Sequence, residues 1–197
     1  MFCQDQILSY ILELKTSVIL PLEILKQSEK KDLHMSHLEV SHDNGIATLT
    51  MNRPEARNAL SMEMRSELCS VLHDIERDAS VRCVVLKGAG DHFMAGGDVK
   101  GMGESIKKPP EEIRKEFMLR IHDLHPIMFA MRRMPKPIIA SCQGAAAGAG
   151  VSMALACDLV IASEDAFFTL AYCKIGTSPD GSSSFHLPRA VCIKKAM

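Results

Sequence analysis

The stretch Gln143–Asp158, QGAAAGAGVSMALACD, decides how this chain folds. Seven small residues follow Gln143 and lead into an apolar segment. Glycine and alanine let another molecule approach the backbone closely, and a helix beginning near Gly148 would aim unpaired N–H groups at that molecule. The ligand atom that suits such N–H groups is an oxygen that carries negative charge. A small-residue helix packed tightly against a sheet explains the same residues without any ligand.

The residues before this stretch predict a hairpin, a helix and a strand. Apolar and polar residues alternate over 38–51 on either side of Asp43-Asn44-Gly45, which is typical of a β-hairpin. A helical stripe from Met64 to Ile75 follows Ser61, a good N-cap residue. The run 81–86, apolar apart from Arg82, then indicates a strand covered on both faces.

The pattern continues with a second long helix and further strands. Apolar residues recur at helical spacing from Ile113 to Met131, and we expect this helix to end before Pro135. Because strands and helices alternate, the chain predicts an α/β fold with a mainly parallel sheet and right-handed crossovers. The remaining predicted strands are 138–142, 159–162 and 167–169.

Two glycine-rich connections follow predicted strands and can meet at one point. The first, KGAGDHFMAGGDVKGM, occupies residues 87–102, and the second is the opening stretch. Each can donate a backbone N–H, one near Gly97 and one near Ala149, and two converging donors are what an oxyanion hole requires. Neither connection matches GxxxxGK[ST] or a GxGxxG followed by a helix, so phosphate binding of those kinds is not indicated.

Composition excludes several classes of function. The apolar fraction of 47% and the charged fraction of 24% are those of an ordinary globular protein. A net charge of -1 offers no reason to expect nucleic acid as a partner. The seven cysteines lack metal-ligand spacing and indicate buried thiols in a reducing compartment. Because of this spacing, we expect no metal site. No apolar run reaches the roughly 20 residues of a membrane span, so we expect no span either.

Residues 1–34 differ from the rest of the chain. An apolar stripe at helical spacing is broken by Pro21 and ends in the charged segment SEKKD. We therefore expect an N-terminal extension over 1–34 and a domain over 35–197. The extension is either an amphipathic helix docked on the domain or a segment upstream of a true start at Met35. Its lack of arginine argues against a mitochondrial transit helix.

Four motifs resemble the enoyl-CoA hydratase/isomerase, or crotonase, superfamily. The motifs are MNRPEARNALS, HFMAGGDVKGM, QGAAAGAGVSMALACDLVIAS and KIGTSPDGSSSFHLPR, in this order. The resemblance implies a spiral of ββα repeats, an acyl-CoA thioester as substrate, and a homotrimer or hexamer. It implies no cofactor beyond the coenzyme A of the substrate. Members continue for several tens of residues after the position of Met197, so their C-terminal helices are expected to be truncated here. The expected location is the bacterial cytoplasm or, as an alternative, the mitochondrial matrix.

The same resemblance assigns candidate binding residues. In this family two main-chain N–H groups hold the thioester oxygen, and they map to Gly97 and Ala149. Arg57, directly after PEA, lies where other members place residues beside CoA. Arg57 and Lys100 are equally explained as solvated surface charges. The substrate- and CoA-binding residues that the resemblance implies are Arg57, Gly97, Asp98, Val99 and Lys100.

The acid and base residues decide which reaction we expect. Hydratases of the family use two glutamates, and those positions hold Ser152 and Tyr172, which we assign to the acyl pocket. Water addition needs a base and an acid, and neither side chain replaces a carboxylate at its ordinary pKa. Asp180 lies where family isomerases commonly carry a catalytic aspartate, and its surroundings resemble the 1,2-epoxyphenylacetyl-CoA isomerase branch. The expected reaction is an isomerisation that shifts a double bond or rearranges an epoxide.

Three alternatives stay open at this level. Asp180 stands in a Pro-Asp-Gly turn sequence and can be a turn residue only. The chain can be a truncated, non-catalytic variant that binds acyl-CoA or another subunit. It can also be a hydratase despite the absent glutamates. We expect His92 and His186 to be packed or hydrogen-bonded residues rather than catalysts.

Overall fold

The computed structural model describes residues 36–105 and 107–197. The expectations for residues 1–34 lie outside these ranges. The described part opens with the predicted hairpin, formed by β1 (Leu38–Asp43) and β2 (Ile46–Met51). Asn44 and Gly45 have φ values of 48° and 82°, which is the left-handed backbone that a two-residue hairpin turn needs. The hairpin prediction is confirmed.

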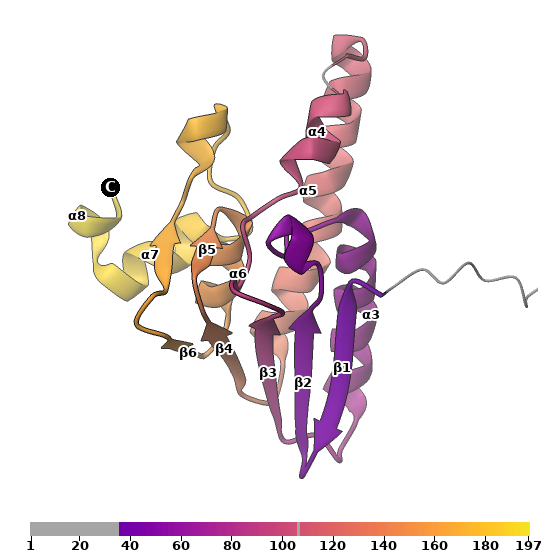
Figure 1. The fold of residues 1–197 in the computed structure, drawn as a ribbon, viewed down its shortest axis with the longest axis vertical. Coiled ribbons are helices and arrows are strands. Elements are labelled where there is room, and N and C mark those ends of the chain that lie inside the picture. The colour runs from indigo at the N-terminus through magenta and orange to yellow at the C-terminus, as the bar shows by residue number, and fades with distance from the viewer. Residues whose placement is uncertain (1–35, 106) are drawn as a thin grey trace, which may run out of the picture. The chain divides into compact units, whose positions relative to one another are not determined.

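A five-stranded sheet in the order β1-β2-β3-β4-β6 forms the main layer (Figure 1). It adds β3 (Cys83–Gly88), β4 (Ile138–Cys142) and β6 (Leu159–Ala162), all parallel to β2. The predicted strand 81–86 was wrong in its bounds and in its burial. Val84 and Leu86 are buried while Lys87 is exposed, so β3 is fully covered on one face only.

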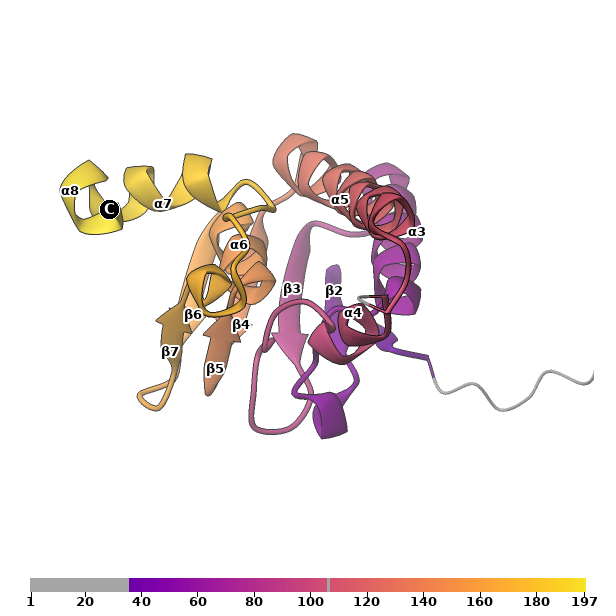
Figure 2. The same cartoon turned by 90° about the horizontal axis from the view of Figure 1, so that it is seen from above.

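Two long helices lie side by side against this sheet, α3 (Met62–Arg77) and α5 (Pro110–Arg133) (Figures 1 and 2). The Ser61 hydroxyl accepts a hydrogen bond from the Met64 N–H at 3.1 Å, which confirms the predicted N-cap. Helix α5 ends before Pro135 as expected. Its buried residues run from Leu124 to Met131, whereas its first half is half-buried or exposed. The predicted apolar stripe therefore packs against the core only in its second half.

A second, smaller layer gives the fold its spiral form. Strands β5 (Ala145–Ala147) and β7 (Phe167–Thr169) pair in parallel, and single bridges join Met94 to Ala146 and Leu60 to Gly97. Each turn of the chain thus places one strand in the main sheet and one short segment in this layer, followed by a helix. The expected spiral of ββα repeats is confirmed.

Several elements of this spiral were not predicted. Helix α4 (Val99–Ser105) begins inside the first glycine-rich connection, and β5 lies inside the second, where we expected a turn. The segment after β7 contains a short 3-10 helix, η3 (Tyr172–Ile175), and α7 (Ser183–Val191) begins soon after the Pro-Asp-Gly turn sequence. Three alanines have little strand propensity, so β5 exists because its neighbours supply hydrogen-bond partners. The other helices of the described residues are η2 (Pro54–Ala56), α6 (Ala149–Ala156) and α8 (Ile193–Ala196).

A helix that crosses a membrane needs roughly 20 mostly apolar residues. Within residues 36–105 and 107–197, no helix is both long enough and apolar enough to cross one.

Candidate active site

The two glycine-rich connections touch each other through their backbones. Gly96 has a φ of 107°, and a Cβ atom there would lie 3.0 Å from the carbonyl oxygen of Ala147. Gly148 has a φ of 48°, and a Cβ atom there would lie 3.9 Å from the Cα atom of Gly96. Both positions have a positive φ that favours glycine, and at Gly96 the close Ala147 carbonyl also leaves little room for a side chain.

Main-chain hydrogen bonds hold the two connections in register. Met94 N–H donates to the carbonyl of Ala145 at 3.0 Å, and Ala147 N–H donates to the carbonyl of Met94 at 2.9 Å. Gly150 packs so closely that a Cβ atom would lie 2.3 Å from the Met94 carbonyl oxygen. The segments that carry Gly97 and Ala149 therefore start from one rigid junction.

The amide groups of Gly97 and Ala149 are both available to a ligand. Ala149 is the first residue of α6, where an N–H has no intrahelical acceptor. Within the described residues, neither amide donates to a protein acceptor. Both residues border a cavity of about 530 Å³, a size that suits a small-molecule site.

Asp180 borders the same cavity and is held at both its carboxylate and its main chain. The Tyr172 hydroxyl donates to Asp180 Oδ1 at 2.7 Å. The hydroxyls of Ser152 and Ser183 donate to the Asp180 carbonyl at 3.0 Å and 2.9 Å. Of the described residues that border this cavity, Asp180 alone carries a carboxylate.

Tyr172 acts as a hydrogen-bond donor to this carboxylate. Burial raises the pKa of Tyr172 to about 12, and the neighbouring Asp180 carboxylate acts in the same direction, while the Ser152 hydroxyl opposes it. The phenol is therefore protonated at neutral pH, and it cannot serve as a base there.

The two residues predicted for the acyl pocket are placed differently. Tyr172 borders the cavity. Ser152 is fully buried and does not border it, because its hydroxyl lies behind Tyr172 at 3.0 Å from the phenol oxygen. The structure therefore gives Ser152 a supporting position and leaves Tyr172 as the pocket residue.

The predicted CoA-binding segment is divided by the start of α4. Gly97 and Val99 border the cavity, but Asp98 does not. The Asp98 carboxylate accepts from the Gly101 N–H at 3.2 Å and pairs with the Arg53 guanidinium at 3.2 Å. Partial burial opposes ionisation, yet the Gly101 N–H and Arg53 together lower the pKa of Asp98. Asp98 thus has a structural position at the N-terminus of α4.

Arg57 and Lys100 lie outside the cavity. Both side chains are exposed and neither borders the cavity. The Arg57 carbonyl accepts from the N–H of Ala95 at 2.9 Å, and Ala95 borders the cavity, so the backbone of Arg57 contacts a cavity residue. Their assignment to CoA stays a prediction.

The histidines set aside above lie in structural positions. His92 Nδ1 accepts from the Ala145 N–H at 3.2 Å. His186 is buried, and burial, followed by Arg132 and Arg189, lowers its pKa. Neither ring borders the cavity.

Three cations at the cavity were missed by sequence reasoning. Arg65 of α3, Arg120 of α5 and Lys174 of η3 all border it. Arg65 carried a readable signal, because it lies on the same helical stripe as the buried residues Met64 and Leu68. A charged residue inside an apolar stripe indicates a buried polar role. Arg120 carries a similar signal, because it lies at helical spacing between Phe117 and Leu124, and no comparable pattern marks Lys174.

The fold and this cavity define an α/β spiral protein with two main-chain N–H groups and one carboxylate around a small-molecule site. The family model for enoyl-CoA hydratase/isomerase matches residues 41–197. The chain therefore belongs to the enoyl-CoA hydratase/isomerase family, and the resemblance to the crotonase superfamily is confirmed.

Curated relatives carry several different activities in their names. The chain is 38% identical over 161 residues to 4-chlorobenzoyl coenzyme A dehalogenase-2 of an Arthrobacter species, covering 82% of this chain and 57% of the relative. It is 37% identical to 1,2-epoxyphenylacetyl-CoA isomerase of Escherichia coli, with 83% and 60% covered. It is 40% identical to a probable enoyl-CoA hydratase of Rhodobacter capsulatus, with 83% and 60% covered.

Solved structures show the same fold. An enoyl-CoA hydratase from Polaromonas sp. JS666 is 36% identical and superimposes with a TM-score of 0.74, covering 81% of this chain and 60% of that one. The chain spans 57% to 60% of the length of the three curated relatives. Family and fold are thus established, and the three named activities leave the reaction open.

Proposed function

We propose that this chain binds an acyl-CoA thioester and isomerises it by moving a proton between carbons near the thioester carbonyl. The observation that carries the proposal is the meeting, at one cavity, of two main-chain N–H groups that donate to no acceptor among the described residues with the carboxylate of Asp180. The identity to 1,2-epoxyphenylacetyl-CoA isomerase supports it as well.

The first part of the site stabilises charge. In the proposal, the N–H groups of Gly97 and Ala149 donate to the thioester oxygen and form an oxyanion hole. Thioester α-protons are weakly acidic, so the enolate formed by their removal needs such donors. Each donor contributes roughly 3 kcal/mol to transition-state stabilisation, by the measured effect of donor deletions in other enzymes.

The second part of the site moves the proton. For a 3-enoyl-CoA, the Asp180 carboxylate removes a proton from the α-carbon, and the electron pair of that bond is delocalised onto the thioester oxygen. The protonated Asp180 then returns the proton to the γ-carbon, which gives the 2-enoyl-CoA. One carboxylate suffices, and the step needs neither an oxidant nor a co-reactant.

The hydrogen bond from Tyr172 supports this role. It fixes the orientation of the Asp180 carboxylate and leaves Oδ2 to face the substrate in the proposed mechanism. Hydration is disfavoured, because it needs a base for water and a separate acid for carbon. With its raised pKa, Tyr172 is a poor acid, and Ser152 is buried behind the cavity surface.

The test replaces the proposed base while keeping its shape. Asp180→Asn should abolish conversion of 3-hexenoyl-CoA to 2-hexenoyl-CoA, measured by absorbance of the conjugated product, while calorimetry still detects binding. Asp165→Asn is the matched control, because Asp165 is an exposed aspartate that does not border the cavity.

Two results would contradict the proposal. Undiminished turnover by Asp180→Asn would remove Asp180 from the mechanism. A wild-type protein that binds acyl-CoA but converts no enoyl- or epoxy-acyl-CoA would favour the non-catalytic alternative. The homotrimer or hexamer expected from the family stays a prediction.

A further inference from the structure

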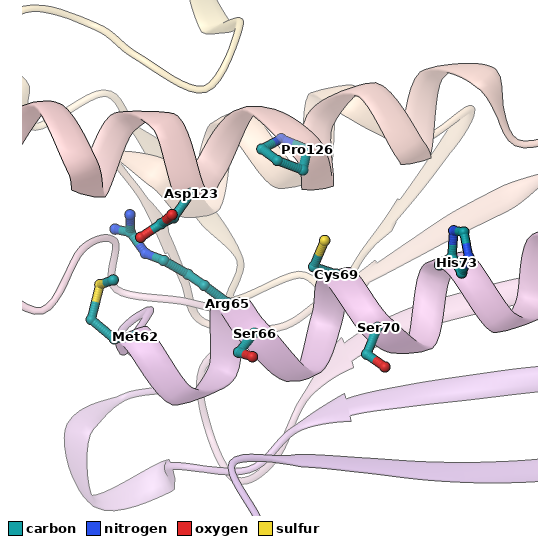
Figure 3. A pocket seen from close by; sticks show the side chains of 8 residues that line it. All are labelled: Met62, Arg65, Ser66, Cys69, Ser70, His73, Asp123 and Pro126. Atoms are coloured by element: carbon teal, nitrogen blue, oxygen red, sulfur yellow. The ribbon is translucent and has the colours of Figure 1, made fainter. Parts of the chain in front are cut away.

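Arg65 is a buried cation that borders two cavities. It projects from α3 and is 5% exposed. On one side it borders the cavity of Gly97, Ala149 and Asp180. On the other it borders a cavity of about 570 Å³ between α3 and α5, where Figure 3 shows its side chain reaching toward Asp123.

The hydrogen bonds of Arg65 are incomplete. One terminal nitrogen, Nη1, donates to the main-chain carbonyl of Arg120. The buried Nε has no hydrogen-bond partner among the described residues. A buried donor without an acceptor costs free energy, so an incoming acceptor gains more here than at a solvated arginine.

The side chains that line the cavity of Gly97, Ala149 and Asp180 carry more positive than negative charge. Burial lowers its pKa, and so does the neighbouring Arg120, while Asp180 and Asp123 act in the opposite direction. The cavity is bordered by three cations, Arg65 among them, against the one carboxylate of Asp180. The cavity lining therefore carries excess positive charge before any ligand binds.

The phosphates of coenzyme A do not account for Arg65. Those groups are strongly hydrated and need cations that reach solvent. Lys174 is exposed and Arg120 is half-buried, so both can meet a phosphate at the cavity mouth. Arg65 interacts electrostatically with Asp180, the proposed base, so it lies on the side of the cavity that would hold the acyl group.

We propose that Arg65 makes this cavity selective for acyl-CoA thioesters whose acyl chain carries a second carboxylate. This inference rests on the proposed acyl-CoA function and adds the substrate class to it. A guanidinium presents several donors in a fixed plane, and a carboxylate accepts two of them at once. In this arrangement the ligand carboxylate accepts from the part of the guanidinium that borders the cavity, and Nε stays buried in the described structure.

The experiment compares two saturated ligands that cannot isomerise, so binding is measured apart from catalysis. Adipoyl-CoA and hexanoyl-CoA have the same six-carbon chain and differ in the terminal carboxylate. Calorimetry is run on wild type, Arg65→Met, Arg65→Lys and the control Arg82→Met. Arg82 is an exposed arginine that does not border the cavity and donates to the Asn44 carbonyl at 3.1 Å.

Wild type and Arg82→Met should bind adipoyl-CoA about tenfold more tightly than hexanoyl-CoA, as a charge-assisted pair predicts. Arg65→Met should lose this preference. Arg65→Lys should retain part of it, because the charge stays while the planar fork is lost. A 6-hydroxyhexanoyl-CoA ligand should bind like hexanoyl-CoA, since it lacks the charge.

Each other outcome overturns the inference. Equal affinities in wild type, a preference that survives in Arg65→Met, or adipoyl-like affinity for the hydroxy ligand would each do so. If hexanoyl-CoA binds without discrimination, the proposed acyl-CoA function still stands. If neither ligand binds, both proposals fail. Should Arg65→Met not fold, the wild-type ligand comparison and Arg65→Lys still decide the matter.

Discussion

At the scale of single residues, Ala149 offers only its main chain. It is the first residue of α6, and its N–H has no acceptor among the described residues. Proline is tolerated at this helical position because the missing N–H is unpaired there in any case. Substitution by proline therefore removes the proposed donor with little cost to the helix.

We expect Ala149→Pro to lower kcat for 3-hexenoyl-CoA isomerisation by about 10²- to 10³-fold, as loss of one oxyanion donor does elsewhere. Ala149→Ser keeps the N–H and should stay within a fewfold of wild type. Steady-state kinetics with parallel circular dichroism checks both. Equal activity of the proline and serine variants would exclude the Ala149 amide from the mechanism.

Tyr172 and Ser152 both donate hydrogen bonds to Asp180. Both positions are expected from the family to hold glutamates in hydratases. Here the phenol donates to Asp180, and the serine hydroxyl bonds to the Asp180 main chain. Two side chains without a carboxylate thus hold in place Asp180, the residue that we propose as the base.

At the scale of elements, α4 follows Gly97 and Asp98 directly and contributes Val99 and Met102 to the cavity wall. Asp98 accepts the Gly101 N–H, which is the hydrogen bond of an N-terminal helix cap, and it pairs with Arg53. The side chains of Arg53 and Asp98 are only 17% and 25% exposed, so solvent screens this pair less than a surface pair. The element that follows Gly97 is therefore anchored by a charge.

Asp98→Asn should lower the free energy of unfolding by roughly 1 kcal/mol at pH 7, since the cap acceptor stays but the ion pair is lost. The folded-state pKa of Asp98 lies below its ordinary value of 3.8. Its contribution is therefore complete above pH 3.8 and is lost as pH falls through the folded-state pKa.

Denaturant unfolding of wild type and Asp98→Asn between pH 7 and pH 2 measures this difference. The gap between the two proteins should be constant down to about pH 4 and then narrow. A gap that keeps its size on acidification would show that the charge of Asp98 does not stabilise the fold.

At the scale of the whole molecule, the spiral brings distant segments to one cavity. Arg65 comes from α3, and Gly97 lies between β3 and α4. Ala149 is the first residue of α6, and Asp180 lies between β7 and α7. The main sheet and its helices supply the buried core, and the second layer of short pairings sets the positions of the amides.

The position of Arg65 predicts a conflict between stability and binding. A buried donor without an acceptor costs free energy, and an apolar side chain of similar volume does not carry that cost. Arg65→Met should therefore raise the free energy of unfolding of the chain by roughly 1 kcal/mol, although one hydrogen bond to the Arg120 carbonyl is lost.

Thermal and denaturant unfolding of Arg65→Met beside wild type and Arg82→Met provides the measurement. A loss of stability by about 2 kcal/mol or more would mean that Arg65 mainly holds α3 to α5. That outcome would assign the buried guanidinium to packing.

The sequence by itself determined the family, the hairpin, the capped helix α3, the end of α5 and the strands β4, β6 and β7. These features depend on local chemistry: turn residues, helical spacing, a capping hydroxyl and proline. Gly97, Ala149 and Asp180 lie in motifs that are short, contiguous stretches, so the sequence alone was enough to recognise them.

Only the tertiary structure decided how those motifs meet. Strand β5 is three alanines that pair because Met94 and β7 lie on either side of it. Ser152 became a buried support, and Arg65 became a cavity residue because α5 covers the face of α3 that carries it. Burial and hydrogen-bond satisfaction are properties of neighbours distant in the chain, and a local pattern carries no record of them.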